Sequence, residues 1–569
     1  MLQDNLVKMY EQSFRENREM AALSDYFKDE SFSYYELSKE IAKIHLLFQV
    51  AKIERGDKIA LVGRNNPRWC ISYIATVTYG AVIVPILQDF NANDIVRIIN
   101  HSESRLVFLG DNFWDLMEED QISSVEAVFS LTDFKTIYER NGDTLTLFQK
   151  NIKGNYRSAY PNGFSVSDIT YPELPNDHVC LLNYTSGTTG SSKGVILTLN
   201  NLTGNVLIAA NYRNEETNEL YFRRGGRVLS FLPLAHAYGC AFDFLTQLAV
   251  GGHVTLLGRI PSPKILIEAM QQVRPTVVNC VPLILEKIYR KQVQPMLETG
   301  PMSIAMKIPL VNTALYSVIK NKLLDVFGGE VGVFIVGGAP MNLETEAFLL
   351  KIGFPITVGY GMTECAPLIS FTGPERFKAT SCGKALSAHL DVKINSSDPQ
   401  KVAGEILVRG EHVMIGYYKN EADTNAVLDK DGWLHTGDMG VMDPDGTIYI
   451  RGRCKTMILS ASGQNIYPEQ IEDLLNNLYL VSESLIIENN GKLAALIVPD
   501  YEQARIEGVD NDSLTSIMEA NLKKLNTMVA NYEKVGSVTI YPTEFEKTPK
   551  RSIKRYLYNT SLLTTKVGE

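Results

Sequence analysis

A short stretch rich in glycine and hydroxyl residues, placed directly behind an apolar run, most strongly limits what this chain can fold into. The apolar run, Val179 to Leu182, predicts a buried strand. The stretch behind it reads Tyr-Thr-Ser-Gly-Thr-Thr-Gly-Ser-Ser-Lys-Gly over residues 184–194. Its glycines let backbone N–H groups close around a polyanion, and its hydroxyls can donate to phosphate oxygens or reach a metal ion. The pattern predicts a phosphate-binding loop behind a core strand.

This loop is not the P-loop of kinases and GTPases. That motif ends in Gly-Lys-Ser/Thr, whereas here Ser192 precedes Lys193 and Gly194 follows it. The alternative is a flexible surface turn, which such a composition often forms. Thr185 is also a candidate metal ligand, and Lys193 is a candidate catalytic cation. The residues of the loop that we expect to bind a phosphate-bearing ligand are Thr185, Ser186, Gly187, Thr188, Thr189, Gly190 and Lys193.

The composition bounds the class of protein. With 569 residues the chain is too long for a single core, so we expect two or more domains. A formal net charge of −10 argues against a general nucleic-acid binder. The seven cysteines are scattered and the eight histidines dispersed, which favours reduced thiols and a cytoplasmic location over disulfides or a metal cluster.

Neither an export signal nor a membrane span is predicted. The N-terminal residues carry charges where a signal peptide needs an apolar core. The uncharged stretch Trp69–Gln88 is long enough for a span. Gly80 and Pro85 within it favour a buried helix that turns into a buried strand.

Apolar runs of strand length alternate with helical patterns over most of the chain. Strands are expected at 58–62, 81–85, 105–109, 179–182, 228–232, 253–257, 276–281, 331–336 and 356–359. Helices are expected at 31–50, 66–79, 237–250, 263–273, 283–292, 303–326 and 343–352. The alternation is typical of an α/β fold with parallel strands buried on both faces. After residue 380 strand–turn–strand patterns take over, and a small α+β module begins near residue 456. We predict a large N-terminal α/β domain over 1–454 and a small α+β domain over 455–569.

Two further glycine-containing segments follow expected strands, where open α/β sheets place their ligands. In Gly359–Glu364, Tyr360 offers a flat face for a purine, Thr363 a hydroxyl for phosphate, and Glu364 a hard oxygen ligand for magnesium. In Gly337–Pro340, two glycines permit close backbone approach to a ligand. Taken alone, each segment is more often a plain turn.

Together these motifs resemble those of the adenylate-forming (AMP-binding) superfamily, which includes acyl-CoA synthetases, luciferases and peptide-synthetase adenylation domains. The resemblance extends from about residue 30 to 556, with the motifs in the family's order. The segment Val281–Tyr289 looks like that of long-chain fatty acyl-CoA synthetases. Apolar residues at helical spacing in this segment could equally be plain core.

The resemblance implies a role for each matching residue. Gly338, Ala339 and Pro340 would flank the adenine, and Tyr360, Gly361, Met362 and Thr363 would form the second nucleotide motif, with Glu364 as catalytic magnesium ligand. Asp438 would hold the ribose hydroxyls, Arg453 would lie near the nucleotide, and Lys455 would be the pivot of a hinge that makes the small domain mobile. His236 would stand at the mouth of the acyl pocket as a further candidate catalytic residue.

The chain departs from the family pattern at two positions. Thr456 stands where an aspartate often follows the hinge residue, and Ser552 occupies the position of the family's catalytic lysine. In an extended segment, side chains two residues apart share a face, so Lys550 or Lys554 could replace the missing amine. Alternatively, both belong to a solvated basic run.

The implied activity has two half-reactions. A fatty acid carboxylate reacts with ATP and Mg²⁺ to give an acyl-adenylate and pyrophosphate, and the acyl group then passes to CoA. Transfer to a carrier-protein phosphopantetheine is the alternative, and a weakly catalytic ATP- and acyl-binding protein is a third reading. The sequence leaves open the acyl chain length, the oligomeric state and peripheral association with a membrane.

Overall fold

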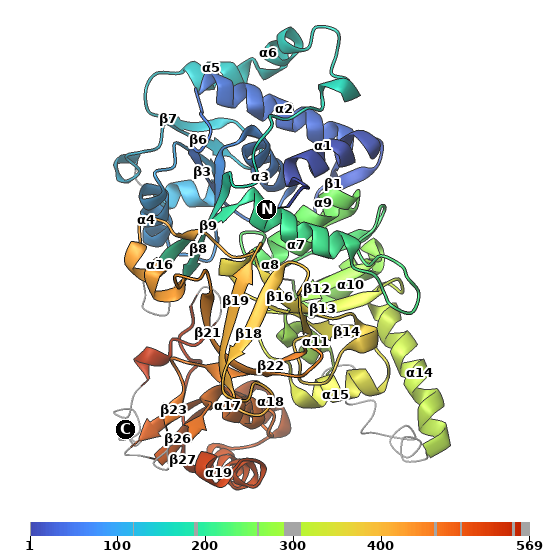
Figure 1. Cartoon of the computed structure of the whole chain (residues 1–569), viewed down its shortest axis with the longest axis vertical. Coiled ribbons are helices and arrows are strands. Elements are labelled where there is room, and N and C mark those ends of the chain that lie inside the picture. The colour runs from blue at the N-terminus through green and yellow to red at the C-terminus, as the bar shows by residue number, and fades with distance from the viewer. Residues whose placement is uncertain are drawn as a thin grey trace. The chain divides into compact units, whose positions relative to one another are not determined.

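The computed structural model describes residues 2–117, 119–186, 192–258, 261–289, 309–459, 464–489, 492–548 and 552–558 (Figure 1). The chain forms two compact units. The large unit comprises Met1–Ala339, Phe348–Asp391 and Val408–Leu434, and the small unit comprises Pro340–Ala347, Val392–Leu407 and His435–Glu569. The small unit thus includes two segments that precede residue 435, whereas the domain division at residue 454 rests on the hinge motif and stays a prediction.

The main sheet of the large unit has a parallel centre and antiparallel edges. Its strands follow the order β20-β9-β8-β4-β3-β5-β6-β7. They span β3 Lys58–Val62, β4 Val82–Ile86, β5 Leu106–Leu109, β6 Ala127–Ser130, β7 Thr136–Glu139, β8 Val179–Ser186, β9 Ser192–Thr198 and β20 Gly416–Tyr417. The strands from β8 through β4, β3 and β5 to β6 are parallel, and the β6–β7, β8–β9 and β9–β20 pairs are antiparallel. The predicted parallel strands form the centre of this sheet, and its edges are antiparallel; at one edge the short connection 187–191 joins β8 to its antiparallel partner β9.

Three smaller sheets complete the large unit. One has the order β10-β11-β1-β2, one is parallel with the order β12-β13-β14, and one is antiparallel with the order β15-β16-β17. Their strands span β1 Ala21–Asp25, β2 Glu30–Ser33, β10 Arg227–Ser230, β11 His253–Leu256, β12 Val277–Cys280, β13 Val333–Val336, β14 Ile356–Val358, β15 Tyr360–Gly361, β16 Leu368–Phe371 and β17 Lys384–Ala385. Every strand predicted before residue 360 is present, and except in β3 one or both ends are shifted by a few residues.

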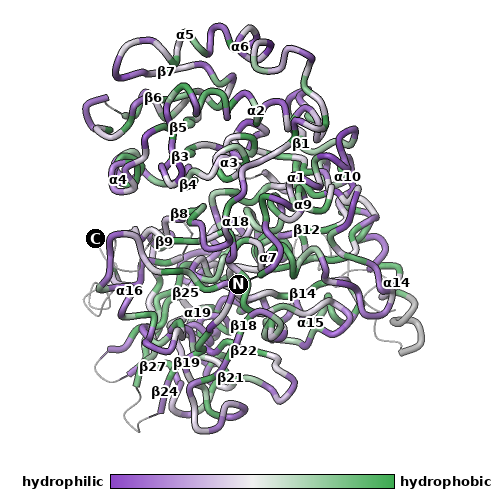
Figure 2. Tube along the Cα trace, turned by 45° about the horizontal axis from the view of Figure 1, so that its top comes forward, coloured by the Kyte–Doolittle hydropathy of each residue, from purple (hydrophilic) through white to green (hydrophobic). Residues whose placement is uncertain are grey.

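The helices before residue 430 match the predicted ones over the described residues and add several, whereas residues 290–292 and 303–308 of two predicted helices lie outside the described part of the chain. They span α1 Leu6–Glu16, α2 Tyr34–Val50, α3 Pro67–Tyr79, α4 Ala92–Ser102, α5 Thr144–Lys150, α6 Ile152–Ala159, α7 Leu199–Asn211, α8 Ala237–Gly239, α9 Thr246–Val250, α10 Pro263–Val273, α11 Pro282–Ile288, α14 Pro309–Val326, α15 Leu343–Lys351 and α16 Glu421–Val427. Ser33 caps α2 in a capping box with Glu36. The stretch 69–88 forms most of α3 and then β4, whose hydropathy can be followed in Figure 2. Among the described residues, no helix combines the length and apolar character that crossing a membrane requires.

The helical run 237–250 contains a π-helical segment, Cys240–Leu245, that buries a carboxyl group. Asp243 is fully buried, and Asn279 Nδ2 donates to its Oδ1 at 2.7 Å. Asp243 Oδ2 and Asn279 Oδ1 have no hydrogen-bond partner among the described residues. Burial raises the pKa of the Asp243 carboxyl to about 7. A proton on this acid removes a buried charge and supplies a donor.

Replacing Asp243 by asparagine is expected to change how stability depends on pH. In the unfolded chain an aspartate loses its proton near pH 3.9, so the stability that the raised pKa contributes is complete below about pH 4. It is lost as the pH rises towards 7. Between pH 4 and 8 the unfolding free energy of the wild type should therefore fall by up to about 4 kcal/mol relative to that of Asp243→Asn. Denaturant unfolding at several pH values measures this, and equal pH slopes in the two proteins would contradict a protonated Asp243.

The small unit has an α+β core of its own, as predicted. A sheet with the order β25-β26-β27 packs against helices α17 and α19, and its core includes Ile471, Leu475, Ile497, Met518 and Leu525. Its elements span α17 Pro468–Asn476, β25 Val481–Asn489, β26 Lys492–Pro499, α18 Tyr501–Glu507, α19 Asn511–Met528 and β27 Val535–Ile540. Before it come β18 Leu390–Asn395, β19 Gly404–Gly410, β21 Leu434–Met442 and β22 Ile448–Arg453, which form one sheet in that order, and the short pair β23 Ile458–Leu459 and β24 Asn465–Ile466.

Candidate nucleotide site

The predicted phosphate loop connects the two strands of a hairpin. Thr185 lies opposite Lys193, and Ser186 lies opposite Ser192, so these residues belong to β8 and β9. The loop residues Gly187, Thr188, Thr189 and Gly190 lie outside the described part of the chain. A strand follows the loop, whereas a helix follows a P-loop, so the two motifs differ in structure as well as in sequence.

Lys193 has two partners in the large unit. Its Nζ lies 2.7 Å from Asp423 Oδ2 and 5.0 Å from the centre of the Tyr417 ring. The Lys193 side chain is 19% exposed. A carboxylate and an aromatic face thus hold one ammonium group beside the loop.

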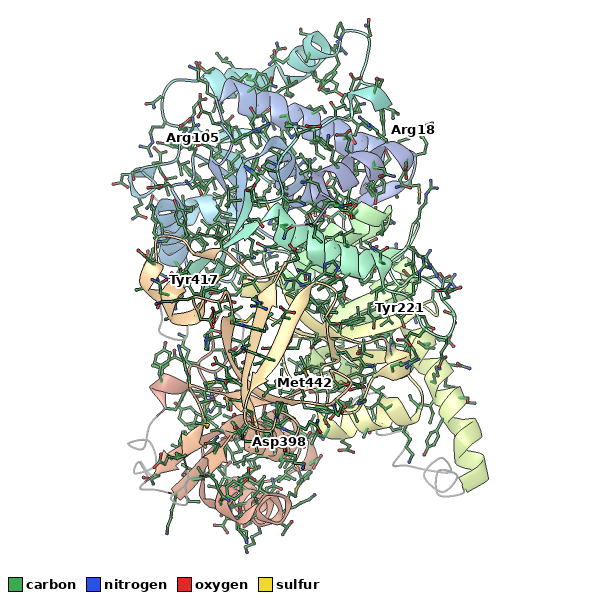
Figure 3. The ribbon with its side chains drawn as sticks, viewed as in Figure 1. Arg18, Arg105, Tyr221, Asp398, Tyr417 and Met442 are labelled. Carbon is green, nitrogen blue, oxygen red and sulfur yellow. The ribbon has the colours of Figure 1, made fainter. Side chains whose placement is uncertain are left out.

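The edge strand β20 brings Tyr417 to this place. Tyr417 pairs with Val195 of β9, and the Tyr418 amide donates to the Gly194 carbonyl at 2.7 Å. Lys193 is two residues from Val195 on the same face of β9, which makes it a diagonal neighbour of Tyr417. Asp423 lies in the first turn of α16, and Asn420, the N-cap of that helix, donates from Nδ2 to Asp423 Oδ2 at 2.8 Å. Tyr417 is labelled in Figure 3.

Tyr417 also contacts the second predicted motif. Its hydroxyl donates to Glu364 Oε1 at 2.8 Å, and the Met414 amide donates to the Glu364 carbonyl at 2.8 Å. Glu364 lies in the single 3₁₀ turn Thr363–Cys365. The structure therefore joins the predicted cation Lys193 and the predicted metal ligand Glu364 through one side chain.

The other residues of this motif are tightly packed. Tyr360 and Thr363 are buried, at 7% and 6% exposure, and Met362 is half-buried. Gly361 pairs with Leu368, and a Cβ added at Gly361 would lie 2.2 Å from the Pro367 carbonyl oxygen. Only glycine fits this backbone approach.

Replacing Gly361 by alanine should therefore lower the free energy of unfolding, by about 2 kcal/mol, as overpacking does. Gly359→Ala is the matched control, because its nearest neighbours would lie at 3.6 Å. The control should change stability by less than about 1 kcal/mol. Thermal unfolding of both variants measures this, and equal losses would contradict the packing reason.

Glu364 has the chemistry that Mg²⁺ prefers. One carboxylate oxygen accepts from Tyr417, while Oε2 accepts no hydrogen bond from a described residue. The described residues contain no group of three or more His, Cys, Asp and Glu side chains that could hold a metal. A single carboxylate fits Mg²⁺, because this ion keeps several waters and binds substrate phosphates besides one or two carboxylates.

The segment after β13 lies against the helical run that begins at His236. A Cβ at Gly337 would lie 3.3 Å from the Tyr238 ring, whose hydroxyl donates to the Ile335 carbonyl at 2.8 Å. Gly338 has φ +86°, a conformation that favours glycine. Gly338, Ala339 and Pro340 are exposed. His236 is the N-cap of α8 and accepts the Tyr238 amide hydrogen on Nδ1 at 3.3 Å.

The predicted ribose and hinge residues lie together in the small unit. Asp438 and Arg453 are cross-strand partners in β21 and β22, with Arg453 Nε 3.2 Å from Asp438 Oδ1. Glu405 of β19 accepts the Gly437 amide hydrogen at 3.0 Å and lies 2.8 Å from His435 Nδ1, and these contacts hold the part of β21 that precedes Asp438. Lys455 is exposed two residues after Arg453.

The C-terminal motif is a hairpin. Lys547 and Ile553 form an antiparallel bridge, and the Thr548 amide donates to the Ser552 carbonyl at 2.8 Å. Residues 547–548 therefore run antiparallel to residues 552–553, and the shared face of Ser552 and Lys554 stays a prediction. Lys554 Nζ lies 3.4 Å from Glu546 Oε2, and Lys550 lies outside the described residues.

The family can now be assigned from the sequence as a whole. A family model described as "AMP-binding enzyme" matches residues 10–418. The chain belongs to the AMP-binding enzyme family.

Several proteins similar to this AMP-binding enzyme are named as ligases or synthetases of long-chain fatty acids. It is 29% identical over 500 residues to the chicken long-chain-fatty-acid–CoA ligase ACSBG2, covering 82% of this chain and 62% of the chicken protein. It is 28% identical to the peroxisomal long chain acyl-CoA synthetase 6 of Arabidopsis thaliana, covering 90% and 75% of the two chains. It is also 28% identical to FadD15, a long-chain-fatty-acid–CoA ligase of Mycobacterium bovis, covering 88% and 86%.

Solved structures confirm the α/β fold of the AMP-binding enzyme. An anthranilate CoA ligase in complex with anthranoyl-AMP superposes with a TM-score of 0.75 at 17% identity, covering 97% of this chain and 96% of that one. The ATP-bound MatB of Rhodopseudomonas palustris gives a TM-score of 0.74 at 21% identity, covering 97% and 98%.

Three residues of the site were missed from the sequence of this AMP-binding enzyme: Tyr417, Asp423 and Glu405. Tyr417 and Asp423 are more than 220 residues from Lys193. A local signal exists only for α16, where Asn420 followed by Asp423 is a helix-start pattern.

Proposed function

We propose that this AMP-binding enzyme is an acid–thiol ligase that activates a long-chain fatty acid with ATP and transfers the acyl group to CoA. The contact of Lys193 and Glu364 with the same tyrosine is the observation that carries the proposal. It places a cation and a hard anionic ligand against one tyrosine, at the end of a strand that follows a loop suited to phosphate. The names of the relatives support a fatty acid as the substrate class.

In the first half-reaction, a carboxylate oxygen of the acid forms a bond to the α-phosphorus while the bond to the bridging oxygen breaks and pyrophosphate leaves. The chain's part is to position the phosphates and to stabilise the charge that spreads over their oxygens. Lys193 does this as a point charge that Asp423 and Tyr417 hold in place. Mg²⁺, when bound at Glu364, supplies further charge neutralisation.

The remaining predicted residues orient the substrates. We assign the phosphates to Thr185, Ser186, Gly187, Thr188, Thr189 and Gly190, with Thr185 as a second metal ligand. The adenine is assigned to Gly338, Ala339, Pro340, Tyr360, Gly361, Met362 and Thr363. Asp438 accepts from the ribose hydroxyls, Arg453 lies near the nucleotide, and His236 lies at the mouth of the acyl site. Lys554 or Lys550 supplies the cation between carboxylate and phosphate.

In the second half-reaction, the CoA sulfur attacks the acyl carbon, AMP leaves, and the thiol proton passes to solvent. We propose that the small domain, 455–569, changes its position about Lys455 between the two steps. One site thus serves two reactions.

Carboxylate-dependent ATP–pyrophosphate exchange tests the first half-reaction. A panel of fatty acids of different chain length gives the substrate class, and adding CoA or a phosphopantetheine carrier protein then identifies the acceptor. Exchange with long-chain acids and product only with CoA would support the proposal. Product formed only with the carrier protein would show that this protein, and not CoA, is the acceptor. The absence of exchange with every acid would favour an ATP- and acyl-binding protein. The cytoplasmic location stays a prediction, which fractionation of cells would test.

A further inference from the structure

Tyr417 contacts two charged residues of the proposed nucleotide site, Lys193 and Glu364. Its ring centre lies 5.0 Å from Lys193 Nζ, and its hydroxyl lies 2.8 Å from Glu364 Oε1. Lys193 comes from the β8–β9 hairpin and Glu364 from the 3₁₀ turn after β15. Two elements far apart in the sequence therefore meet at one phenol.

We propose that Tyr417 is a positioning residue that sets the Glu364 carboxylate for the divalent cation accompanying ATP. The phenol occupies one carboxylate oxygen and leaves the other, Oε2, for the cation. The inference rests on the proposed function, in which Glu364 is the metal ligand.

The backbone of Tyr417 is held by hydrogen bonds to two neighbouring elements. Tyr417 pairs with Val195 in the sheet, and its amide donates to Thr424 Oγ1 at 2.9 Å. The residue is 8% exposed, and its side chain has only two torsions. Glu364 lies in one short turn and has three side-chain torsions, which cost entropy to fix when a ligand binds. A fixed donor on Oε1 restricts these torsions before the cation arrives.

The Tyr417 side chain also holds the ammonium group of Lys193. The Lys193 ammonium lies over the Tyr417 ring and against Asp423. Removal of the hydroxyl alone leaves this arrangement, because the ring remains. A phenylalanine therefore separates the two contacts of Tyr417.

Tyr417→Phe tests the proposal by equilibrium binding. The full chain is titrated calorimetrically with ATP at increasing Mg²⁺ concentrations, with no acid present, so that no reaction takes place. The measurement gives the Mg²⁺ concentration at which the increase in ATP affinity is half-maximal. We expect Tyr417→Phe to raise this concentration about tenfold, the effect of one hydrogen bond to a charged group. ATP binding in EDTA should be unchanged, whereas loss of the Lys193 contacts would weaken it.

Tyr418→Phe is the matched control. The Tyr418 hydroxyl donates to Glu103 Oε2 at 3.2 Å, so this variant also removes a tyrosine–carboxylate hydrogen bond, one residue away. Its Mg²⁺ dependence should equal that of the wild type. Thr424→Ala is a second variant in case Tyr417→Phe does not fold, because it releases the Tyr417 amide. We expect it to raise the same Mg²⁺ concentration about threefold.

The outcomes separate this inference from the proposed function. A folded Tyr417→Phe protein with the Mg²⁺ dependence of the wild type would overturn this inference but not the proposed function. If Tyr417→Phe does not fold, the same result in Thr424→Ala would overturn it. An equal shift in Tyr418→Phe would also overturn it, since the effect would then not be specific to Glu364. ATP binding by the wild type that does not depend on Mg²⁺ would overturn the proposed metal site and this inference with it.

Discussion

Replacing Glu364 by glutamine is expected to slow carboxylate-dependent ATP–pyrophosphate exchange by about a thousandfold, because a metal ion contributes several kcal/mol to such a transition state. Glutamine keeps the size of the side chain and an oxygen that can accept from the Tyr417 hydroxyl, whose contact with Glu364 is 2.8 Å. The fold should therefore survive. What is lost is the negative charge that holds Mg²⁺ beside the phosphates.

Exchange assays across a range of Mg²⁺ concentrations, with circular dichroism to confirm folding, measure this effect. Glu103→Gln is the control, because Glu103 also accepts from a tyrosine hydroxyl, that of Tyr418. It should retain nearly full exchange. A Glu364→Gln enzyme with near wild-type rate at ordinary Mg²⁺ would show that another residue binds the metal.

The fold could be predicted where the pattern is local. Helix α10, Pro263–Val273, and strand β3, Lys58–Val62, have the predicted bounds. The first is a capped amphipathic run and the second an apolar run between turns, and both patterns can be recognised from neighbouring residues alone. Helices α4 and α7 were missed. In α7, three asparagines among the first seven residues hide the helical period, yet Asn201 and Asn205 are buried and bonded to the distant segments 411–413 and 365–368. Helix α7 is thus stabilised by tertiary contacts that its local sequence pattern does not reveal.

Strand pairing was harder to predict than strand existence. The two-residue strand β20, Gly416–Tyr417, has no periodicity to detect, and its partner β9 lies more than 200 residues earlier. Its importance comes from that pairing, which places Tyr417 beside Lys193. Lys193 and Glu364 were found because each lies in a recognisable motif, while their shared neighbour lies in none.

The last part of the chain shows the limit of extrapolating a periodicity. Counting alternate residues back from Ser552 assumed an extended backbone, but residues 547–548 run antiparallel to residues 552–553, while the count forward to Lys554 stays a prediction. The basic run is also less solvated than its composition suggests. Arg555 is paired with the buried Glu472 of α17, and Lys554 with Glu546.

Replacing Lys554 by alanine is expected to slow adenylation by about a hundredfold or more. A carboxylate brought to ~4 Å from a polyphosphate is repelled by about 4 kcal/mol at an effective dielectric of 20, and the serine at 552 cannot offset this. Lys554 is available for the purpose. Its pair with Glu546 is 3.4 Å long and its side chain is 31% exposed, and a pair of this kind contributes at most about 1 kcal/mol. Its flexible stem lets the ammonium leave Glu546 for a stronger partner.

Exchange measured for Lys554→Ala, Lys550→Ala and Ser552→Lys decides which amine acts, with Lys524→Ala on the exposed face of α19 as the control. Loss in Lys554→Ala, with the control unaffected, would assign the role to Lys554, and loss in Lys550→Ala instead would move it to the other candidate. A lysine at position 552 begins two residues before Lys554 along the chain, so its ammonium group starts from a different place. Ser552→Lys should therefore not fully restore exchange to Lys554→Ala. If both alanine variants kept full exchange, no lysine of this hairpin would be needed for adenylation. If Ser552→Lys alone created exchange in an inactive parent, the natural protein would be an ATP- and acyl-binding protein whose catalysis was lost with that one amine.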